Sequence, residues 1–236
     1  MRPGSGRSFL FSSDFHGEET AFRGFARTLA SGPFAAGILA GDLLDEWMPP
    51  DQVHRLVPSD AQPLPSPADR LARALEVRQG QLQALLETSG KPIFFVLGNH
   101  DVTPWMASAR MTDLHGQAVT FEGRRLVGYR WTRMDRYPDE LEADLPALSA
   151  LVDPETVLVT HSPPWGVLDG RPGSRFRFGL KGLHRLPVPR LHLFGHVHEC
   201  AGVEGYAVNG AWPALRRFFA VDPEDGTAKL VEPLPP

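Results

Sequence analysis

Short apolar runs that alternate with helical segments constrain the fold of this chain more than any other feature of its sequence. Each run is too short for a typical helix and is interpreted as a buried β-strand. The runs cover residues 8–13, 36–40, 92–97, 156–160 and 191–194. Helical spacing of apolar residues follows in segments 18–30 and 69–86, and more weakly in 137–151, where Pro146 interrupts it. Strands that alternate with helices predict an α/β fold.

Strand signals without intervening helices occur in two later parts of the chain. Segment 118–129 alternates around Glu122-Gly123, which is a hairpin signal. Three further runs predict a closing antiparallel meander over residues 203–208, 217–221 and 227–231. Added to the alternating units, they predict an α/β sandwich of mixed β-sheets. The length of 236 residues favours a single domain over residues 1–236.

The segment after the second predicted strand, residues 46–67, is unusually rich in proline. Its prolines are Pro49, Pro50, Pro58, Pro63, Pro65 and Pro67. We interpret it as an insertion loop of this domain. Long Pro-rich loops are often functional lids or connectors, but a plain solvated insertion is an equally good interpretation.

Polar side chains that can bind metals follow the ends of five predicted strands. They are Asp14 and His16, Asp42, Asn99 and His100, His161, and His196 and His198. Each cluster alone has an ordinary explanation, such as a helix cap or a turn. Five of the nine histidines nevertheless lie at these positions. Because the carboxyl ends of strands in an open α/β sheet meet at one crevice, we expect these side chains to gather there.

The chemistry of this set indicates a transition-metal site. Carboxylate oxygens, an amide oxygen and neutral imidazoles suit first-row metals such as Mn, Fe, Co, Ni or Zn. No cysteine is among the proposed ligands, so a structural zinc site of the cysteine type is disfavoured.

The same residues form motifs that resemble the calcineurin-like metallophosphoesterases, whose pattern is D-x-H, G-D-x-x-D, G-N-H-D/E, a later H, and G-H-x-H. The motifs here are Asp14-Phe15-His16, Gly41-Asp42-Leu43-Leu44-Asp45, Gly98-Asn99-His100-Asp101, His161 and Gly195-His196-Val197-His198. The resemblance extends from Ser12 to about Gly210 and looks strongest to small members similar to cyclic-nucleotide phosphodiesterases. It implies a four-layer α/β/β/α sandwich.

The resemblance also implies two divalent cations and their ligands. One would be held by Asp14, His16, Asp42 and His198, and the other by Asp42, Asn99, His161 and His196. Asp42 would bridge the two ions. Two cations about 3.5–4 Å apart can share a water, lower its pKa toward about 7, and bind phosphoryl oxygens.

The implied reaction is in-line attack of a metal-bridging hydroxide on phosphorus. His100 lies beside the ligand Asn99 but outside both ligand sets, and is expected to protonate or stabilise the leaving oxygen. Asp45 occupies the family position that pairs with this histidine. Asp101 is nearer in sequence, but its interpretation as a local turn or cap carboxylate is favoured.

Several functions compete on this site. We favour hydrolysis of small phosphodiesters, cyclic nucleotides among them. A phosphomonoesterase, a nuclease and a non-catalytic partner-binding module are the alternatives. A phosphoprotein phosphatase is disfavoured, because that branch carries an arginine after the second motif, where this chain has Glu46, and lacks the closing G-H-x-H. The net charge of −4 and the lack of length for an added module argue against a dedicated nucleic-acid-binding role.

A basic loop lies between His161 and His196. Its cations are Arg171, Arg175, Arg177, Lys181, Arg185 and Arg190, with Phe176 and Phe178 between them. Arginine recognises phosphate and aromatic rings can stack on a base, so the loop is either a leaving-group pocket or an ordinary solvated loop. Trp47 and Trp165 follow two ligand-bearing strands and are candidates for walls of the cleft.

The remaining features point to a cytoplasmic protein without a membrane span. No run approaches about 18 apolar residues, and the N-terminus lacks the apolar run of a signal peptide. The single cysteine, Cys200, fits a reducing compartment.

Overall fold

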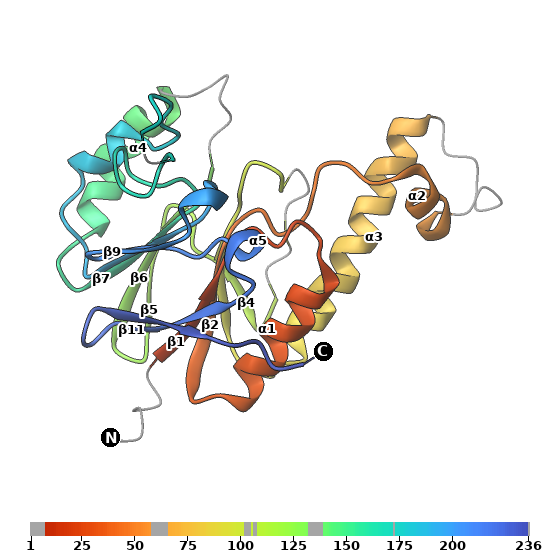
Figure 1. Cartoon of the computed structure of the whole chain (residues 1–236), viewed down its shortest axis with the longest axis horizontal. Coiled ribbons are helices and arrows are strands. Elements are labelled where there is room, and N and C mark those ends of the chain that lie inside the picture. Colours follow the sequence, from red (N-terminus) through yellow and green to blue (C-terminus); the bar gives the residue numbers. More distant parts are fainter. Residues whose placement is uncertain are drawn as a thin grey trace.

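The computed structural model describes residues 8–57, 66–101, 105, 108–131, 139–171 and 173–235. Two β-sheets pack face to face, and helices cover their outer faces, as Figure 1 shows. Helices α1 (Glu19–Ser31) and α3 (Pro67–Glu87) cover the first sheet, and α4 (Asp139–Leu151) covers the second. The four layers confirm the predicted α/β sandwich.

The first sheet has six strands in the order β12-β11-β1-β2-β3-β4. Strands β1 to β4 are parallel to one another, and β11 joins β1 in antiparallel orientation. The strands are β1 (Ser8–Ser12), β2 (Phe34–Ala40), β3 (Ile93–Val96), β4 (Met111–Asp113), β11 (Phe218–Asp222) and β12 (Thr227–Val231).

The second sheet also has six strands, in the order β5-β6-β7-β8-β10-β9. Its four central strands are parallel, and β5 and β9 pair with its ends in antiparallel orientation. The strands are β5 (Ala118–Phe121), β6 (Arg124–Tyr129), β7 (Thr156–Thr160), β8 (Leu191–Phe194), β9 (Gly202–Glu204) and β10 (Ala207–Asn209).

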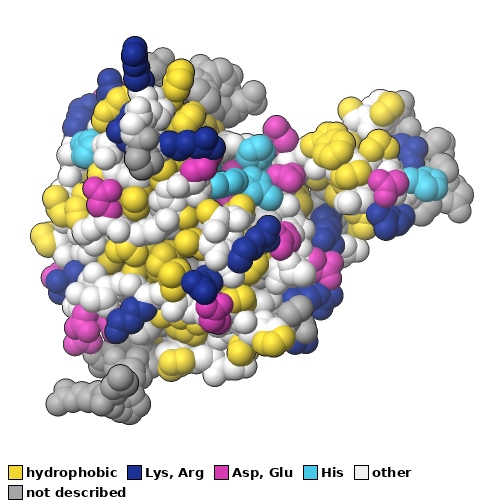
Figure 2. Space-filling view, in the orientation of Figure 1, with side chains coloured by type: hydrophobic (Ala, Val, Ile, Leu, Met, Phe, Trp, Pro, Cys, Tyr) yellow, Lys and Arg dark blue, Asp and Glu magenta, His cyan; other side chains and the backbone are white. Residues whose placement is uncertain are grey.

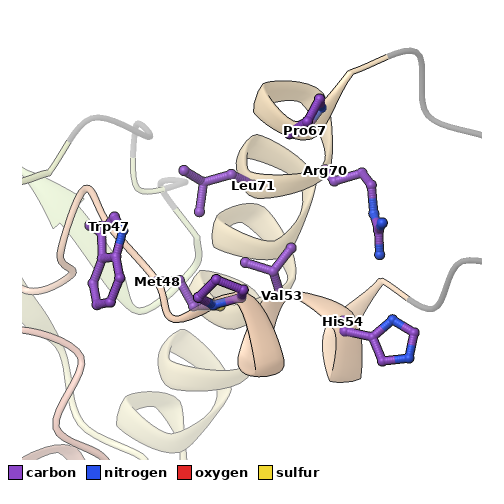
Figure 3. A pocket seen from close by; sticks show the side chains of 8 residues that line it. Trp47, Met48, Val53, His54, Pro67, Arg70 and Leu71 are labelled. Atoms are coloured by element: carbon purple, nitrogen blue, oxygen red, sulfur yellow. The ribbon is translucent and has the colours of Figure 1, made fainter.

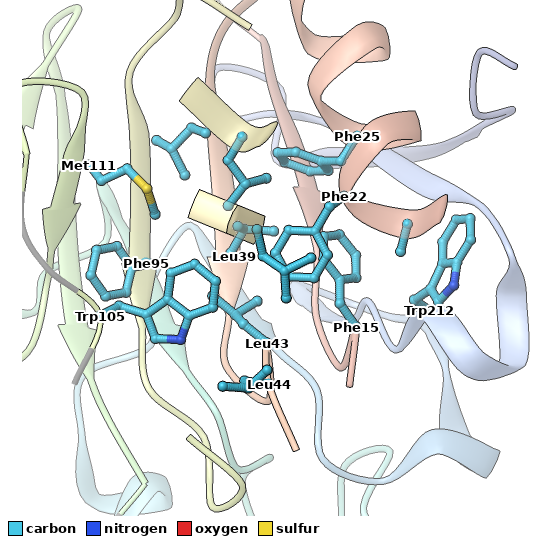
Figure 4. Close-up of a cluster of buried hydrophobic side chains, with 14 of the residues drawn as sticks. Phe15, Phe22, Phe25, Leu39, Leu43, Leu44, Phe95, Trp105, Met111 and Trp212 are labelled. Atoms are coloured by element: carbon cyan, nitrogen blue, oxygen red, sulfur yellow. The ribbon is translucent and has the colours of Figure 1, made fainter. Parts of the chain in front are cut away.

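The central strands are buried on both faces, which explains their continuous apolar sequences. Successive side chains of a strand point to opposite faces, so Phe9 and Phe11 of β1 enter the core between the sheets while Leu10 packs under the helices. The helix-covered core of the first sheet is strongly aromatic. Figure 4 shows Phe15, Phe22, Phe25, Phe95, Trp105 and Trp212 within it.

The Pro-rich segment 46–67 is not only a loop, because it contains helix α2 (Pro50–Leu56) and the start of α3. Pro50 and Pro67 lie in the first turns of the two helices, where proline is tolerated because its missing N–H would have no intrahelical partner. Residues 58–65 lie outside the described part of the chain. Pro146 does not end α4, which continues to Leu151.

The predicted closing meander is wrong as a single unit. Gly205 has a positive φ of 59° and turns β9 into β10, so segment 203–208 is a hairpin rather than one strand. The chain then passes through the short helix α5 (Trp212–Leu215) and enters the first sheet as β11. The C-terminal strands are therefore divided between the two sheets. Among the described residues, no helix has the length and apolar character needed to cross a membrane.

Candidate metal centre

The predicted ligands lie where parallel strands of both sheets end. Asp14 and His16 follow β1, Asp42 follows β2, and Asn99 follows β3, all in the first sheet. His161 follows β7, and His196 and His198 follow β8, in the second sheet. Figure 2 shows histidine and acidic side chains gathered at this edge of the molecule.

The backbone is unusual at these positions. Seven described non-glycine residues have a positive φ, and four of them are the predicted ligands Asp14, His16, Asp42 and His196. A left-handed conformation costs an ordinary residue of the order of 1 kcal/mol or more and persists only where the surrounding structure enforces it. Such strain is commonest at functional sites, so it agrees with a ligand site here.

A first group joins the end of β1 to the end of β8. Nε2 of His198 lies 3.2 Å from both Nε2 of His16 and Oδ1 of Asp14. The backbone N–H of His196 donates to the Asp14 carboxylate at 3.1 Å, which ties the two loops together. Asp14 is completely buried, whereas His16 and His198 are half-buried. This group can accept a metal ion.

A second group lies beside the first. Oδ1 of Asn99 is 2.9 Å from both Nε2 of His161 and Nδ1 of His196. Nδ1 of His161 is 2.8 Å from the carbonyl oxygen of Ala40 and donates to it, so in the neutral ring Nε2 carries a lone pair. Such a hydrogen bond orients a histidine for metal binding.

Asp42 lies between the two groups. Its Oδ2 is 3.4 Å from Nε2 of His161 and 4.0 Å from Nε2 of His16, while its Oδ1 accepts the backbone N–H of His100 at 2.8 Å. The carboxylate is therefore close to donors of both groups, as the expected bridging position requires.

The spacing of these atoms fits divalent cations. Ligand atoms about 2.0–2.1 Å from one ion lie about 2.8–3.0 Å apart in octahedral geometry and about 3.3–3.4 Å apart in tetrahedral geometry. The distances within the groups, 2.9 Å at Asn99 and 3.2 Å at His198, agree with this. The mixture of nitrogen and oxygen donors without sulfur also suits first-row metals. All seven predicted ligands are thus brought together, and their role as ligands stays a prediction.

The charges of the second group favour a positive charge at its centre. Burial opposes charging of the His161 ring, yet the carboxylates of Asp42 and Asp14 raise its pKa to about 9. Burial also opposes charging of Asp42, but His161 holds its pKa well below the usual range. Burial, with the nearby His161, lowers the pKa of His196 to about 4, which leaves this ring neutral. The group thus offers a carboxylate and a neutral imidazole to a cation.

Glycines allow the loops to approach closely. A Cβ on Gly98 would overlap the carboxylate and backbone nitrogen of Asp42, and a Cβ on Gly195 would overlap the carboxylate of Asp14. The G-N-H and G-H-x-H motifs therefore need glycine because another loop occupies the space of a side chain.

His100 and Asp45 lie at the edge of the first group, next to His16. The rings of His16 and His100 are 5.2 Å apart, and Oδ1 of Asp45 is 2.7 Å from Nδ1 of His16. Candidate ligand atoms of these three residues all lie within 4.8 Å of one another. The hydrogen bond of Asp45 with His16 leaves Nε2 of His16 facing the first group.

Asp101 has a structural role that its sequence position only hinted at. Its Oδ1 accepts the backbone N–H groups of Leu43 and Leu44, and its Oδ2 accepts that of Gly98. This buried carboxylate therefore joins the loop that carries Asp42 to the loop after β3.

The basic loop is largely occupied by ion pairs. Arg171 pairs with Glu199, Arg177 pairs with the buried Asp169, and Arg185 pairs with Glu142. These ion pairs favour a structural role of the three arginines within the loop over a role in binding phosphate.

Trp131 is a residue of the site that the sequence interpretation missed. Its ring centroid is 4.7 Å from that of His196 and 6.0 Å from that of His161. It comes two residues after β6, which carries none of the predicted ligands, so the rule that singled out Trp47 and Trp165, an aromatic residue after a ligand-bearing strand, does not select it.

A separate pocket of about 340 Å³ lies between α2 and α3, lined by Trp47, Met48, Pro50, Val53, His54, Pro67, Arg70 and Leu71. Figure 3 shows Leu71 pointing from α3 toward Trp47. Trp47, which is 64% exposed, comes two residues after Asp45. In Figure 2 hydrophobic side chains of the projecting part of the molecule, which α2 and the start of α3 form, lie beside the histidine and acidic side chains.

Comparison with known families gives a match to the calcineurin-like phosphoesterase model over residues 7–200. The human protein named metallophosphoesterase domain-containing protein 1 is 38% identical over 101 residues, which cover 38% of this chain and 30% of that protein. UPF0046 protein K07C11.7 of Caenorhabditis elegans is 34% identical over 98 residues, covering 39% of this chain and 33% of that protein. The matches thus span about a third of these curated relatives.

Solved structures share the fold over nearly the whole chain. One crystal structure superposes with a TM-score of 0.70 at 16% identity, covering 97% of this chain and 99% of the other. The protein TT1561 of Thermus thermophilus superposes with a TM-score of 0.63 at 15% identity, covering 96% of this chain and 98% of the other. At such identities the likeness concerns the fold alone.

Proposed function

The chain belongs to the calcineurin-like phosphoesterase family, and from its site we propose that it is a metal-dependent phosphoesterase that hydrolyses small phosphodiesters. The observation that carries the proposal is the position of Asp42 between two groups of metal-capable side chains. In this proposal Asp14, His16, Asp42 and His198 hold one divalent cation, and Asp42, Asn99, His161 and His196 hold the other.

When bound, the two cations would supply Lewis acidity to the phosphoryl oxygens and a water of lowered pKa. The protein supplies the positions of the groups around them. Asp42 is held by the N–H of His100, and Asp101 fixes the loop behind it. Because these hydrogen bonds hold the loop with Asp42 against the loop after β3, the ligand side chains need little rearrangement to bind the cations.

His100 is the residue that we propose for proton transfer to the leaving oxygen. Its ring borders His16 without belonging to either proposed ligand set, and it is only half-buried, so it can reach a substrate from the open side. Asp45 lies within reach of His100 and is also bonded to His16. We propose that Asp45 orients these two rings.

Cyclic nucleotides are included in the proposed substrates because motifs around His161 and His196 resemble those of cyclic-nucleotide phosphodiesterases. We also propose that the protein acts in the cytoplasm and not on membranes. The same proposal includes no dedicated nucleic-acid-binding module. It is supported by the net charge of −4 and by the single cysteine.

Hydrolysis of bis-p-nitrophenyl phosphate with added Mn²⁺ tests this function. We expect turnover that EDTA abolishes, and a loss of at least about 100-fold in kcat/KM for Asp42→Asn, since weaker changes around metal ligands already cost 10–100-fold. Asp51→Asn, at an exposed position on α2, is the matched control and should keep wild-type activity. EDTA-resistant turnover, or wild-type activity of Asp42→Asn, would refute the proposal.

A panel of cyclic nucleotides, linear diesters and monoesters then separates the substrate classes. Higher kcat/KM for diesters than for the matching monoesters is the expected order. A reversed order would assign a phosphomonoesterase instead.

A further inference from the structure

Trp131 forms a fixed aromatic wall beside the second group of ligands. Its ring is tilted by 36° against that of His196 at a centroid distance of 4.7 Å, and lies edge-on to His161. Its backbone N–H donates to the carbonyl of Leu97 at 2.9 Å, one residue before the G-N-H motif. The backbone that carries the indole is therefore bonded to the same loop that carries Asn99.

Phe178 brings a second aromatic ring to the same histidine from the basic loop. Its centroid is 6.4 Å from that of His196, at an interplanar angle of 79°, and the residue is 56% exposed. The backbone N–H of Phe178 donates to the carbonyl of Asp169. The buried carboxylate of Asp169 in turn accepts the Gly166 N–H at 2.7 Å and Arg177 Nη1 at 3.0 Å. An exposed phenyl ring is thus held at the edge of the site by a buried anchor.

We propose that Trp131 and Phe178 form a subsite for a planar aromatic group carried by the substrate ester. The inference rests on the proposed function and specifies its substrate class: phosphate esters with an aryl ring or a nucleobase. Each kind of ring presents a π-face that can stack, and stacking of a base on an aromatic side chain contributes about 1–3 kcal/mol.

Ionic recognition does not explain this side of the site as well. Arg177, the cation next to Phe178, is turned to the buried Asp169, and Arg171 pairs with Glu199. Exposed aromatic surface therefore remains as the distinctive feature of the loop beside His196. Burying that surface under a planar ligand would also remove it from water.

The test compares ligands that differ only by an aromatic group, on the Mn²⁺-loaded protein by isothermal titration calorimetry. Phenyl phosphate is paired with methyl phosphate, and adenosine 5′-monophosphate with ribose 5-phosphate. We expect at least one aromatic member to bind about tenfold more tightly than its partner, which corresponds to about 1.4 kcal/mol. Preference in the first pair assigns an aryl ring, and preference only in the second assigns a nucleobase.

Trp131→Leu and Phe178→Leu should each lower this ratio at least threefold while affinity for the non-aromatic member changes less than twofold. Phe176→Leu is the matched control, because Phe176 is 77% exposed on the same loop and should leave the ratio unchanged. If Trp131→Leu fails to fold, the exposed Phe178 decides alone.

Three results would overturn the inference: a ratio near one in both pairs, a ratio that survives in both variants, or a ratio lost on Trp47→Leu instead. The last would move the aromatic group to the pocket between α2 and α3. The proposed function fails separately, if no ester is hydrolysed although the binding ratio follows the prediction.

Discussion

Nε2 of His16 and Nε2 of His198 lie 3.2 Å apart, although 182 positions separate the two residues in the sequence. Nδ1 of His16 is bonded to Asp45, so Nε2 of a neutral His16 ring presents a lone pair toward His198. Two lone pairs at this distance repel unless a proton or a cation lies between them. A proton or cation between the two rings would therefore hold the loop after β1 and the loop after β8 together.

Loss of one of these rings should weaken binding at the first group. We expect His198→Ala to lower the affinity of the EDTA-treated protein for Mn²⁺ at one of its sites at least tenfold, measured by equilibrium dialysis. His54→Ala, on α2, is the control and should bind as wild type does. Equal Mn²⁺ binding by His198→Ala and wild type would exclude His198 as a ligand.

Close approach of two loops makes Gly98 irreplaceable. A Cβ at Gly98 would overlap Asp42, so Gly98→Ala should destabilise the protein by about 1–3 kcal/mol and reduce Mn²⁺ affinity. Gly80→Ala is the matched control, because nothing lies within 4 Å of its Cβ on α3. The free energy of unfolding of Gly80→Ala, measured with urea, should be about 0.5–1 kcal/mol higher than that of wild type. An unfolding midpoint for Gly98→Ala equal to that of wild type would disprove the steric explanation.

A buried histidine outside the ligand set should make stability depend on pH. Burial first, and then the charge of His184, lower the pKa of His192 to about 3, and Nε2 of His192 lies 2.8 Å from Oγ1 of Thr160. Thr160 donates to the carbonyl of Ser162, so His192 donates to Thr160 as a neutral ring. His192 therefore stays neutral in the folded protein at pH values below about 6.5, where it becomes protonated in the unfolded chain.

Stability conferred by the neutral ring is therefore complete above about pH 6.5 and is lost as the pH falls toward 3. Between pH 6.5 and 5.5 the EDTA-treated wild type should lose about 1 kcal/mol more than His192→Gln, which retains a donor but does not titrate. Urea unfolding at the two pH values measures this difference. Parallel pH profiles of the two proteins would contradict the assignment.

The sequence predicts the ligand loops well because each ligand follows a run that is buried on both faces. His161 directly follows β7 and His196 follows β8 by one glycine, and both positions were expected from the sequence. Parallel strands connected by helices can be arranged in only a few ways. Their carboxyl ends therefore lie together at one edge of the sheet, and so do the ligands that follow them.

Other features depend on contacts that no local pattern records. Segment 203–208 satisfies a strand pattern, but Gly205 turns it into a hairpin. Pro50 is counted as a loop former although it lies in the first turn of α2. Trp131 lies beside His196 and His161, and its backbone is bonded to Leu97, which is far from it in the sequence.

The central claim is that these loops hold two cations that share Asp42, and anomalous diffraction from crystals grown with Mn²⁺ tests it most directly. The account predicts two anomalous peaks about 3.5–4 Å apart, one among Asp14, His16 and His198 and the other among Asn99, His161 and His196. A single peak, or none within bonding distance of the Asp42 carboxylate, would contradict it.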